Sequence, residues 1–309
     1  MSGRQHSLDK IREFGKKATK IASESDIFFN ASAITFNIFI CAIPFVLILI
    51  SIVGFVLSYD TAYNELIRYG EELIPQFSYE SKPNDVFSGT DTIRSVLNPL
   101  IGARTVFGIL GFSILIFFTQ GLFHSLKHVI YAVFDIEERA HPLIEVAQNF
   151  LVVGILGTVF LFFSLSVSFI SLFDFSDFTI PSTDIVIRLS WVYEVLNLTI
   201  PVVFTFLLQL VIFRFISERK IPWKVALMGA STYTFLFEIA KYGLAYYLGY
   251  AFSAYRYFYQ GYAVLIVIGV WAFYSAILFV ISVILAKAFY DTFIKKVPEI
   301  DANPYTAIS

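Results

Sequence analysis

Residues 221–262 have the sequence IPWKVALMGASTYTFLFEIAKYGLAYYLGYAFSAYRYFYQGY. This stretch starts at a basic edge, continues as an apolar segment long enough to cross a bilayer, and ends in a cluster of tyrosines. Two charged residues, Glu238 and Lys241, lie near the middle of the apolar segment. Since a charge at bilayer depth costs about 3 kcal/mol on insertion scales, such residues are functional candidates by default. The stretch therefore predicts a membrane helix that carries a polar site.

The whole chain has the composition of an integral membrane protein. Of its 309 residues, 57% are hydrophobic, 18% aromatic and 15% charged, whereas a soluble domain carries about 25% charged residues. The formal net charge of -2 gives no basic field that would attract nucleic acid, so we expect no nucleic-acid partner. The first apolar run, from near Ile27 to Leu57, is too long for a signal peptide and indicates a retained anchor.

Six apolar runs predict six transmembrane helices. Each run has about the 20 residues that a helix needs to cross the hydrocarbon core, and helices satisfy their own backbone hydrogen bonds in lipid. The fold class is therefore an all-α polytopic membrane protein, with residues 1–309 forming a single membrane domain. The runs cover residues 31–57, 105–123, 146–173, 191–213, 225–249 and 263–287.

Basic residues in the connecting segments predict the orientation, because cytoplasmic loops are enriched in Lys and Arg. Of the 22 Lys and Arg residues, 15 lie in one alternating set of segments and only six in the other. The basic set contains the N-terminal segment 1–26 and the tail 288–309, so both termini are expected in the cytoplasm. Ile11, Phe14, Ala18 and Ile21 recur at helical spacing in segment 1–26. That segment is either an amphipathic helix on the membrane surface or a solvated basic tail.

The first outer segment, residues 58–104, carries two apolar faces at helical spacing. One face contains Tyr63 and Ile67, and the other contains Leu97 and Ile101. We expect two amphipathic helices, broken near Lys82-Pro83, that form an external cap or lie in the outer interface.

Three charged residues form the main candidate site. Glu238 and Lys241 are three residues apart and share a helix face, and Glu194 near the outer start of its span should lie at a depth close to Lys241. Either carboxylate is a plausible partner for Lys241, because pairing is how intramembrane charges persist. Two interpretations stay open. One is an outward-opening polar cavity that binds an anionic or zwitterionic group or relays protons; the other is an ion pair that fixes helix register.

Further polar residues add weaker candidates. Asn37 and Gln120 lie at membrane depth, where such side chains often only hold helices together. Arg256 lies among tyrosines that indicate an interfacial belt, although its planar fork also suits a lipid phosphate. His124 and His128 have a spacing that suits two metal ligands, but no Cys or nearby acid completes a site. The chain has no P-loop, GxSxG or paired-Cys motif, so we expect no cofactor, metal or enzyme activity.

Several stretches resemble the YihY/BrkB family of bacterial inner-membrane proteins. The resemblance covers nearly the whole chain after residue 20, with Trp223, Gly229, Lys241 and Tyr247 at matching places. Where the family commonly ends its last span in Gly-Ala-Glu, this chain has Ile284-Leu285-Ala286-Lys287, and the family's Tyr-Gly pair is here Tyr259-Gln260-Gly261-Tyr262. The stretches that carry the resemblance are NASAITFNIFICAIPFVLILISIVG (30–54), GLFHSLKHVIYAVFDIEERAH (121–141), IPWKVALMGA (221–230), FEIAKYGLAYY (237–247) and VWAFYSAILFV (270–280).

The resemblance implies six transmembrane helices, an inner-membrane location and envelope or lipid phenotypes, including movement of lipid A precursors. It also implies that the ribonuclease label once given to this family is a misassignment. The leading hypothesis is a transport protein that moves a lipid or amphiphilic anion, with Glu238 and Lys241 lining its cavity, Glu194 as partner and Arg256 at the outer mouth. Membrane lipids are then the expected partners. The alternative is a non-transporting envelope scaffold that uses residues 58–104 as its partner surface.

Overall fold

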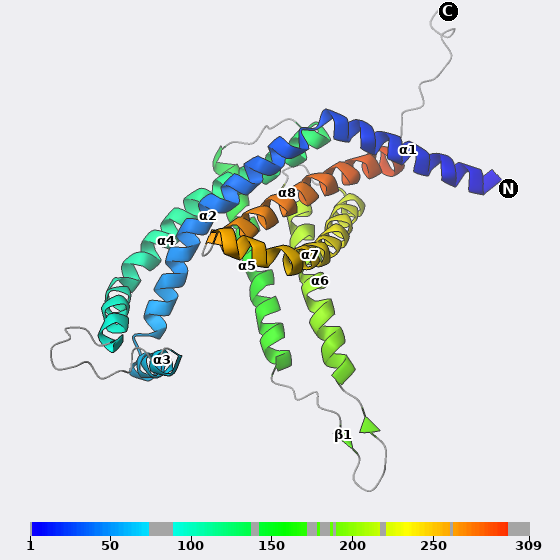
Figure 1. The fold of residues 1–309 in the computed structure, drawn as a ribbon. Helices are drawn as coiled ribbons and strands as arrows, with labels where there is room; N and C mark the ends of the chain where they lie inside the picture. Colours follow the sequence, from blue (N-terminus) through cyan, green and yellow to red (C-terminus); the bar gives the residue numbers. More distant parts are fainter. Residues whose placement is uncertain are drawn as a thin grey trace, which may run out of the picture. The chain divides into compact units, whose positions relative to one another are not determined.

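The computed structural model describes residues 2–73, 89–136, 142–171, 178–179, 186–187, 190–216, 221–259 and 262–295. Apart from short turns, these residues are helical except for one antiparallel pair of two-residue strands, in which Phe178 pairs with Ile187 and Thr179 with Val186. Figure 1 shows α1 (Ser2–Glu24), α2 (Ile27–Val56), α3 (Asp60–Leu73), α4 (Gly89–Phe134), α5 (Pro142–Ser171), β1 (Phe178–Thr179), β2 (Val186–Ile187), α6 (Ser190–Phe215), α7 (Trp223–Tyr259), α8 (Ala263–Phe289) and the π-helical turn η3 (Tyr290–Ile294).

Among the described residues, five stretches of helix are long and apolar enough to cross a membrane, which confirms a membrane protein with multiple helices. They correspond to five of the six predicted spans. The remaining predicted span lies in α7, which is 37 residues long but is not one of the five. Its charged and hydroxyl-bearing residues lower its mean hydropathy. The five stretches are Ile27–Val56, Arg94–Phe134, Val146–Ser168, Glu194–Phe215 and Val264–Ile294.

The chain divides into two compact units, which are described separately. The smaller unit contains residues 36–122, and the main unit contains residues 1–35 and 123–309. Both boundaries fall inside helices, one in α2 and the other in α4.

In the smaller unit, α2 and α4 approach closely through small residues. The Ser51 hydroxyl donates a hydrogen bond to the Arg104 carbonyl oxygen at 2.6 Å. A Cβ atom at Gly54 would lie 2.9 Å from the Leu100 carbonyl oxygen, and one at Gly111 would lie 3.0 Å from the Pro44 carbonyl oxygen. Small residues at such contacts let helix backbones pack against each other, which is how membrane helices associate without a hydrophobic driving force.

This packing corrects one predicted boundary. The second cap helix and the second span, expected as separate elements, form the single 46-residue helix α4. The same face of α4 packs on α2 at Leu100 and at Gly111, and these contacts stabilise one continuous helix across the predicted boundary. The expected break near Lys82-Pro83 lies outside the described residues. The two predicted apolar faces of the cap do pack together, because Leu57, Ile67 and Leu97 form a buried cluster with Tyr63 and Ile101 beside it.

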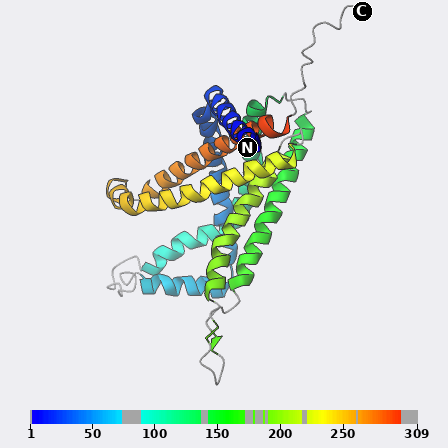
Figure 2. The same cartoon turned by 90° about the vertical axis from the view of Figure 1, so that its right-hand side faces the viewer.

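In the main unit, α6, α7 and α8 meet in a core near the connection between α6 and α7. Figure 2 shows α5 beside α6, and α7 beside α8. Phe213 of α6 is fully buried, and its ring centroid lies 5.8 Å from that of Phe279 in α8. A Cβ atom at Gly229 of α7 would lie 2.6 Å from the Phe213 ring, so any side chain there would force this buried ring to shift.

Large apolar side chains cover the outside of both units. Phe36 and Phe117 of the smaller unit are 64% and 72% exposed, and Phe162 and Phe235 of the main unit are 73% and 66% exposed. A soluble monomer rarely exposes contiguous apolar patches on this scale, whereas lipid solvates them. The described surface therefore suits a bilayer.

We expect Gly54→Ala to weaken the contact between α2 and α4. The added Cβ would lie 2.8 Å from Arg104 Cβ and 2.9 Å from the Leu100 carbonyl oxygen, neither of which is a flexible side-chain end. Overpacking of this kind costs about 1–3 kcal/mol. Thermal unfolding in detergent measures the loss of stability. The unfolding is monitored by thiol-reactive labelling of Cys41, which is the single cysteine and lies on α2.

Gly102→Ala is the matched control, since a Cβ there meets nothing within 4 Å. It should leave the unfolding midpoint unchanged or raise it, because alanine has the higher helix propensity. Equal midpoints for the two variants would contradict the close packing at Gly54.

Candidate functional site

The two central charges of α7 form an ion pair with each other. Lys241 Nζ lies 2.6 Å from Glu238 Oε2, and the residues are three positions apart on one helix face. Lys241 Nζ also lies 5.5 Å from the centroid of the neighbouring Tyr242 ring, within the range of a cation–π contact. Of the two pairings expected for Lys241, the structure therefore forms the one within α7.

This pair lies at the edge of the packed face of α7. The side chains of Glu238 and Lys241 are 17% and 39% exposed, whereas Tyr233 and Ala240 on the same helix are buried. Figure 2 shows α8 beside α7, and the ring centroids of Phe237 and Trp271 lie 5.0 Å apart between them. The ammonium group of Lys241 keeps N–H donors beyond the one that contacts Glu238, so an anionic oxygen can still be bound there.

Glu194 does not join this pair. It is exposed on α6, and within the described part of the chain no ion pair links it to Lys241. Arg214 of α6 makes its contacts near the connection between α6 and α7 instead. Arg214 donates to the Ile221 carbonyl oxygen at 3.3 Å, and its guanidinium carbon lies 4.9 Å from the centroid of the Trp223 ring. A role for Glu194 as a partner of Lys241 remains a prediction.

Arg256 lies on the last turns of α7, which continues to Tyr259. Its side chain is outside the described part of the structure, as are those of the tyrosines from 250 to 259. Tyr246, one end of the predicted belt, is 87% exposed. The interfacial belt and the contact of Arg256 with a phosphate both stay predictions.

Asn37 and Gln120 lie in the smaller unit, on α2 and α4. A Cβ atom at Gly121 would lie 2.8 Å from Asn37 Oδ1, so the Asn37 side chain packs directly on α4 beside Gln120. One turn further along α2, the Cys41 side chain is hydrogen-bonded to Thr119. These contacts form a polar seam between two helices, the arrangement expected of residues that hold helices together.

Among the described residues, no group of three or more His, Cys, Asp and Glu side chains could hold a metal ion. His124 and His128 lie on α4 in the main unit, and His124 takes part in an interaction of its own.

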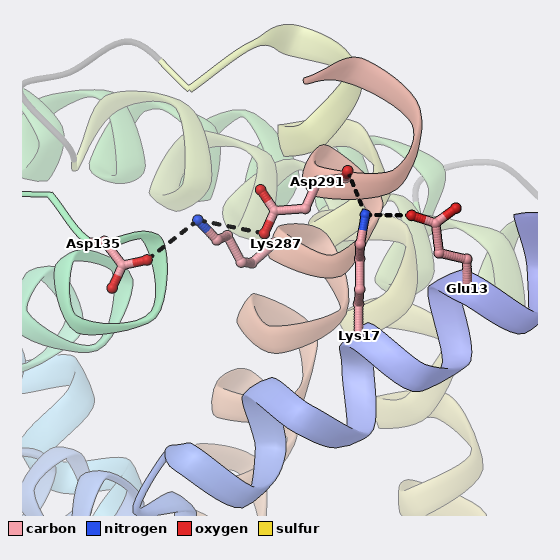
Figure 3. A network of polar contacts seen from close by, with 5 residues as sticks. All are labelled: Glu13, Lys17, Asp135, Lys287 and Asp291. Carbon is pink, nitrogen blue, oxygen red and sulfur yellow. Dashed lines mark hydrogen bonds and ion pairs between the residues drawn. The ribbon is translucent and has the colours of Figure 1, made fainter. Parts of the chain in front are cut away.

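Sequence reasoning missed a network of charges that joins the first and last helices (Figure 3). Lys287 Nζ lies 3.6 Å from Asp291 Oδ2 and 3.5 Å from Asp135 Oδ2. Lys17 Nζ donates to the Asp291 carbonyl oxygen at 2.8 Å and lies 2.7 Å from Glu13 Oε1. The contact between Lys287 and Asp291 could have been predicted from the sequence, because residues four positions apart lie on one helix face. The contacts with Asp135 and Lys17 were not, because they join distant parts of the chain.

The two ends of this network lie at Glu13 and at Asp135. The hydrogen bond and positive charge of Lys17 lower the pKa of Glu13 below its ordinary value. At the other end, Asp135 has a φ of 54°, the left-handed conformation that often ends a helix. The turn at Asp135 directs the chain away from α4 next to Lys287.

An apolar groove lies between α5 and α6 in the main unit. Its volume of about 450 Å³ is within the range of small-molecule sites, about 300–1,000 Å³. The hydroxyls of Thr158 and Ser166 donate to carbonyl oxygens of their own helix, so the groove presents little polar surface. Its lining residues are Thr158, Val159, Phe162, Phe163, Ser166, Leu196, Thr199, Ile200, Val203, Phe204 and Leu207.

The family model described as Virulence factor BrkB matches residues 18–301 of the chain. No curated protein and no solved structure matches it.

Removing Lys241 alone should destabilise the protein more than removing both partners. Lys241→Gln leaves Glu238 without its counter-charge, whereas Glu238→Gln with Lys241→Gln leaves two neutral amides. A surface ion pair contributes about 0.5 kcal/mol to the free energy of unfolding, and breaking a buried pair costs roughly 3–5 kcal/mol. Because this pair is partly exposed, we expect the loss in Lys241→Gln to lie between these two values. Thermal unfolding in lipid nanodiscs measures both variants.

Arg68→Gln is the control, because Arg68 pairs with Glu65 at the same spacing and distance, 2.6 Å, on the exposed helix α3. It should change stability little. A double variant less stable than Lys241→Gln alone would contradict the mutual neutralisation of the α7 charges.

Lowering the pH should weaken the contact between Glu13 and Lys17. Because the folded-state pKa of Glu13 lies below its unfolded value, the pair stabilises α1 above the unfolded pKa, and this contribution is lost as the pH falls through the lowered pKa. Carboxyl chemical shifts in micelles report the titration. Lys17→Met should return the Glu13 pKa towards its ordinary value, and an unchanged titration in that variant would refute the assignment.

Proposed function

Because the chain belongs to the Virulence factor BrkB family and carries several helices apolar enough to cross a membrane, we propose that it is a bacterial inner-membrane protein that moves a lipid or amphiphilic anion across the bilayer. In this proposal α7 is a sixth span. Its 37 residues extend about 55 Å, more than the roughly 30 Å of hydrocarbon, at 1.5 Å per residue. The excess of basic residues in one set of segments then places both termini in the cytoplasm.

The observation that carries the proposal is the ion pair of Glu238 and Lys241. Intramembrane charges are costly and mark substrate or ion pathways, and a pair used only for packing needs no exposed surface. Lys241 is 39% exposed next to its partner. A phosphate or carboxylate can therefore bind the ammonium group by displacing Glu238 or by sharing its donors. Glu238 in turn can accept a proton from the substrate or bind an ammonium group of the substrate.

The groove between α5 and α6 supports an amphiphilic rather than a small polar substrate. An amphiphile needs a polar contact for its headgroup and an apolar surface for its chain. The main unit offers both, with the pair on α7 and the groove on α5 and α6. Phe163 and Phe204 stack at a centroid distance of 4.1 Å and belong to the groove lining.

Glu194 and Arg256 have secondary roles in this mechanism. The exposed Glu194 on α6 is a second carboxylate that a moving ammonium group or proton meets, and Arg256 near the outer end of α7 contacts the phosphate on that side. The sequence contains no ATP-binding motif. Movement is therefore passive or coupled to a proton or ion gradient.

Reconstitution in liposomes with headgroup-labelled lipids tests this function. We expect the wild type to move label between leaflets faster than empty vesicles do. Lys241→Ala should lower that rate about tenfold or more, the effect of losing roughly 1.4 kcal/mol from the rate-limiting step. Lys241→Arg keeps the charge and should retain part of the rate.

Arg68→Ala controls for the general effect of losing a basic residue, since Arg68 forms an equivalent pair outside the spans. It should leave the rate unchanged. Equal movement in wild type, Lys241→Ala and empty vesicles, tested with anionic and zwitterionic lipids and with an imposed proton gradient, would reject the transport function.

A scaffold function is the second candidate, and the cap formed by α3 and the start of α4 favours it. Tyr59, Tyr69 and Val96 there are 72%, 51% and 58% exposed, and aromatic residues are enriched at protein interfaces. Affinity purification with Tyr59→Ser, Tyr69→Ser and Val96→Ser discriminates the two functions. Loss of a stable partner with unchanged lipid movement favours the scaffold.

A further inference from the structure

The N-terminal helix α1 is docked on the end of α8 by its C-terminal half. The ring centroids of Phe14 and Phe293 lie 6.4 Å apart, and Lys17 donates to the Asp291 carbonyl oxygen. Figure 3 shows Lys17 of α1 reaching to the turn at Asp291. The apolar stretch that includes α8 extends to Ile294. Since α1 is held at this end of the stretch, it lies where that span leaves the bilayer.

The apolar face of α1 continues beyond the docked part. Leu8 and Ile11 precede Phe14 at intervals of three residues, which places all three on one side of the helix. Phe14 is partly covered, whereas Leu8 and Ile11 are 62% and 59% exposed. Nothing in the described part of the chain covers this N-terminal extension of the face.

The charges of α1 indicate what covers the apolar face formed by Leu8 and Ile11. The helix has six basic and three acidic residues. Glu13 is neutralised by Lys17, and Lys20 lies 3.9 Å from Glu24 with both side chains largely exposed. Lys10, Arg12 and Lys16 are exposed as well, so a basic flank borders the uncovered apolar face. An apolar stripe beside a basic flank is the pattern of a helix that lies in the interface of an anionic membrane.

We propose that α1 lies along the membrane interface, with Leu8 and Ile11 of its N-terminal half inserted at the level of the upper acyl chains and with Lys10, Arg12, Lys16 and Lys20 on the phosphates of anionic lipids. The C-terminal half stays on η3 through Phe14 and Lys17. The helix thus contacts both the end of α8 and the anionic headgroups of one leaflet. This inference does not rest on the transport function.

A single-cysteine fluorescence experiment tests the contact. Cys41, the one cysteine, is replaced by serine, and an environment-sensitive dye is attached to Leu8→Cys in the full chain. Asp9→Cys is the matched control, because Asp9 is also exposed but points away from the Leu8–Ile11 side. Both are reconstituted in nanodiscs of phosphatidylcholine alone or of phosphatidylcholine with phosphatidylglycerol. Quenching by lipid-borne nitroxide and by aqueous iodide is compared.

With phosphatidylglycerol present, we expect nitroxide to quench the dye at residue 8 several-fold more than at residue 9, and iodide to quench it less. Replacing Lys10, Arg12, Lys16 and Lys20 by glutamine should abolish this difference, and replacement by arginine at the lysine positions should retain it. Raised salt should weaken the shielding of the unaltered helix, which keeps the test valid if the glutamine variant misfolds.

Three results would overturn the proposal. The first is equal iodide access at residues 8 and 9 in anionic nanodiscs. The second is shielding of residue 8 that is identical with and without phosphatidylglycerol. The third is shielding that occurs only when two copies share a nanodisc, which would assign the face to a second copy of the chain.

Discussion

The mutual neutralisation of Glu238 and Lys241 is the constraint on which α7 depends. A single charge in the middle of this helix would oppose its placement among apolar neighbours. The two side chains meet at 2.6 Å within one helix face, so the neutralisation needs no other element. The neighbours of α7 consequently pack on it through contacts that do not involve this pair, such as Phe237 against Trp271 and Gly229 against Phe213.

Much of this architecture could be predicted from local patterns. The six apolar runs lie in helices α2, α4, α5, α6, α7 and α8 of the structure, and five of these are apolar enough to cross a membrane. The spacing of Glu238 and Lys241 made their pairing one of the two expected for Lys241, because i,i+3 neighbours share a helix face. The two apolar faces of the cap followed from helical spacing, but the contact between them, in the cluster of Ile67 and Leu97, did not. The length of α4 was not readable, since its continuity depends on α2 packing against both sides of the expected boundary.

The remaining features depend on tertiary packing that a sequence does not display. Glu194 and Lys241 were expected at similar depth, but depth alone does not determine which faces of α6 and α7 turn towards each other. In the sequence, Lys287 stood out only as part of the ending that replaces the family's Gly-Ala-Glu. In the structure its side chain is 10% exposed, between carboxylates that lie four and 152 positions away in the chain. Only the nearer of these partners follows from local periodicity.

The hydrogen bond from Lys17 to Asp291 spans 274 positions of the chain. During synthesis α1 leaves the ribosome long before η3, so its binding surface on η3 does not exist until the chain has been made beyond Asp291. For that entire period α1 lacks its protein partner while the intervening helices enter the bilayer. Docking of α1 therefore follows the synthesis of α8 and requires that α8 and η3 have formed.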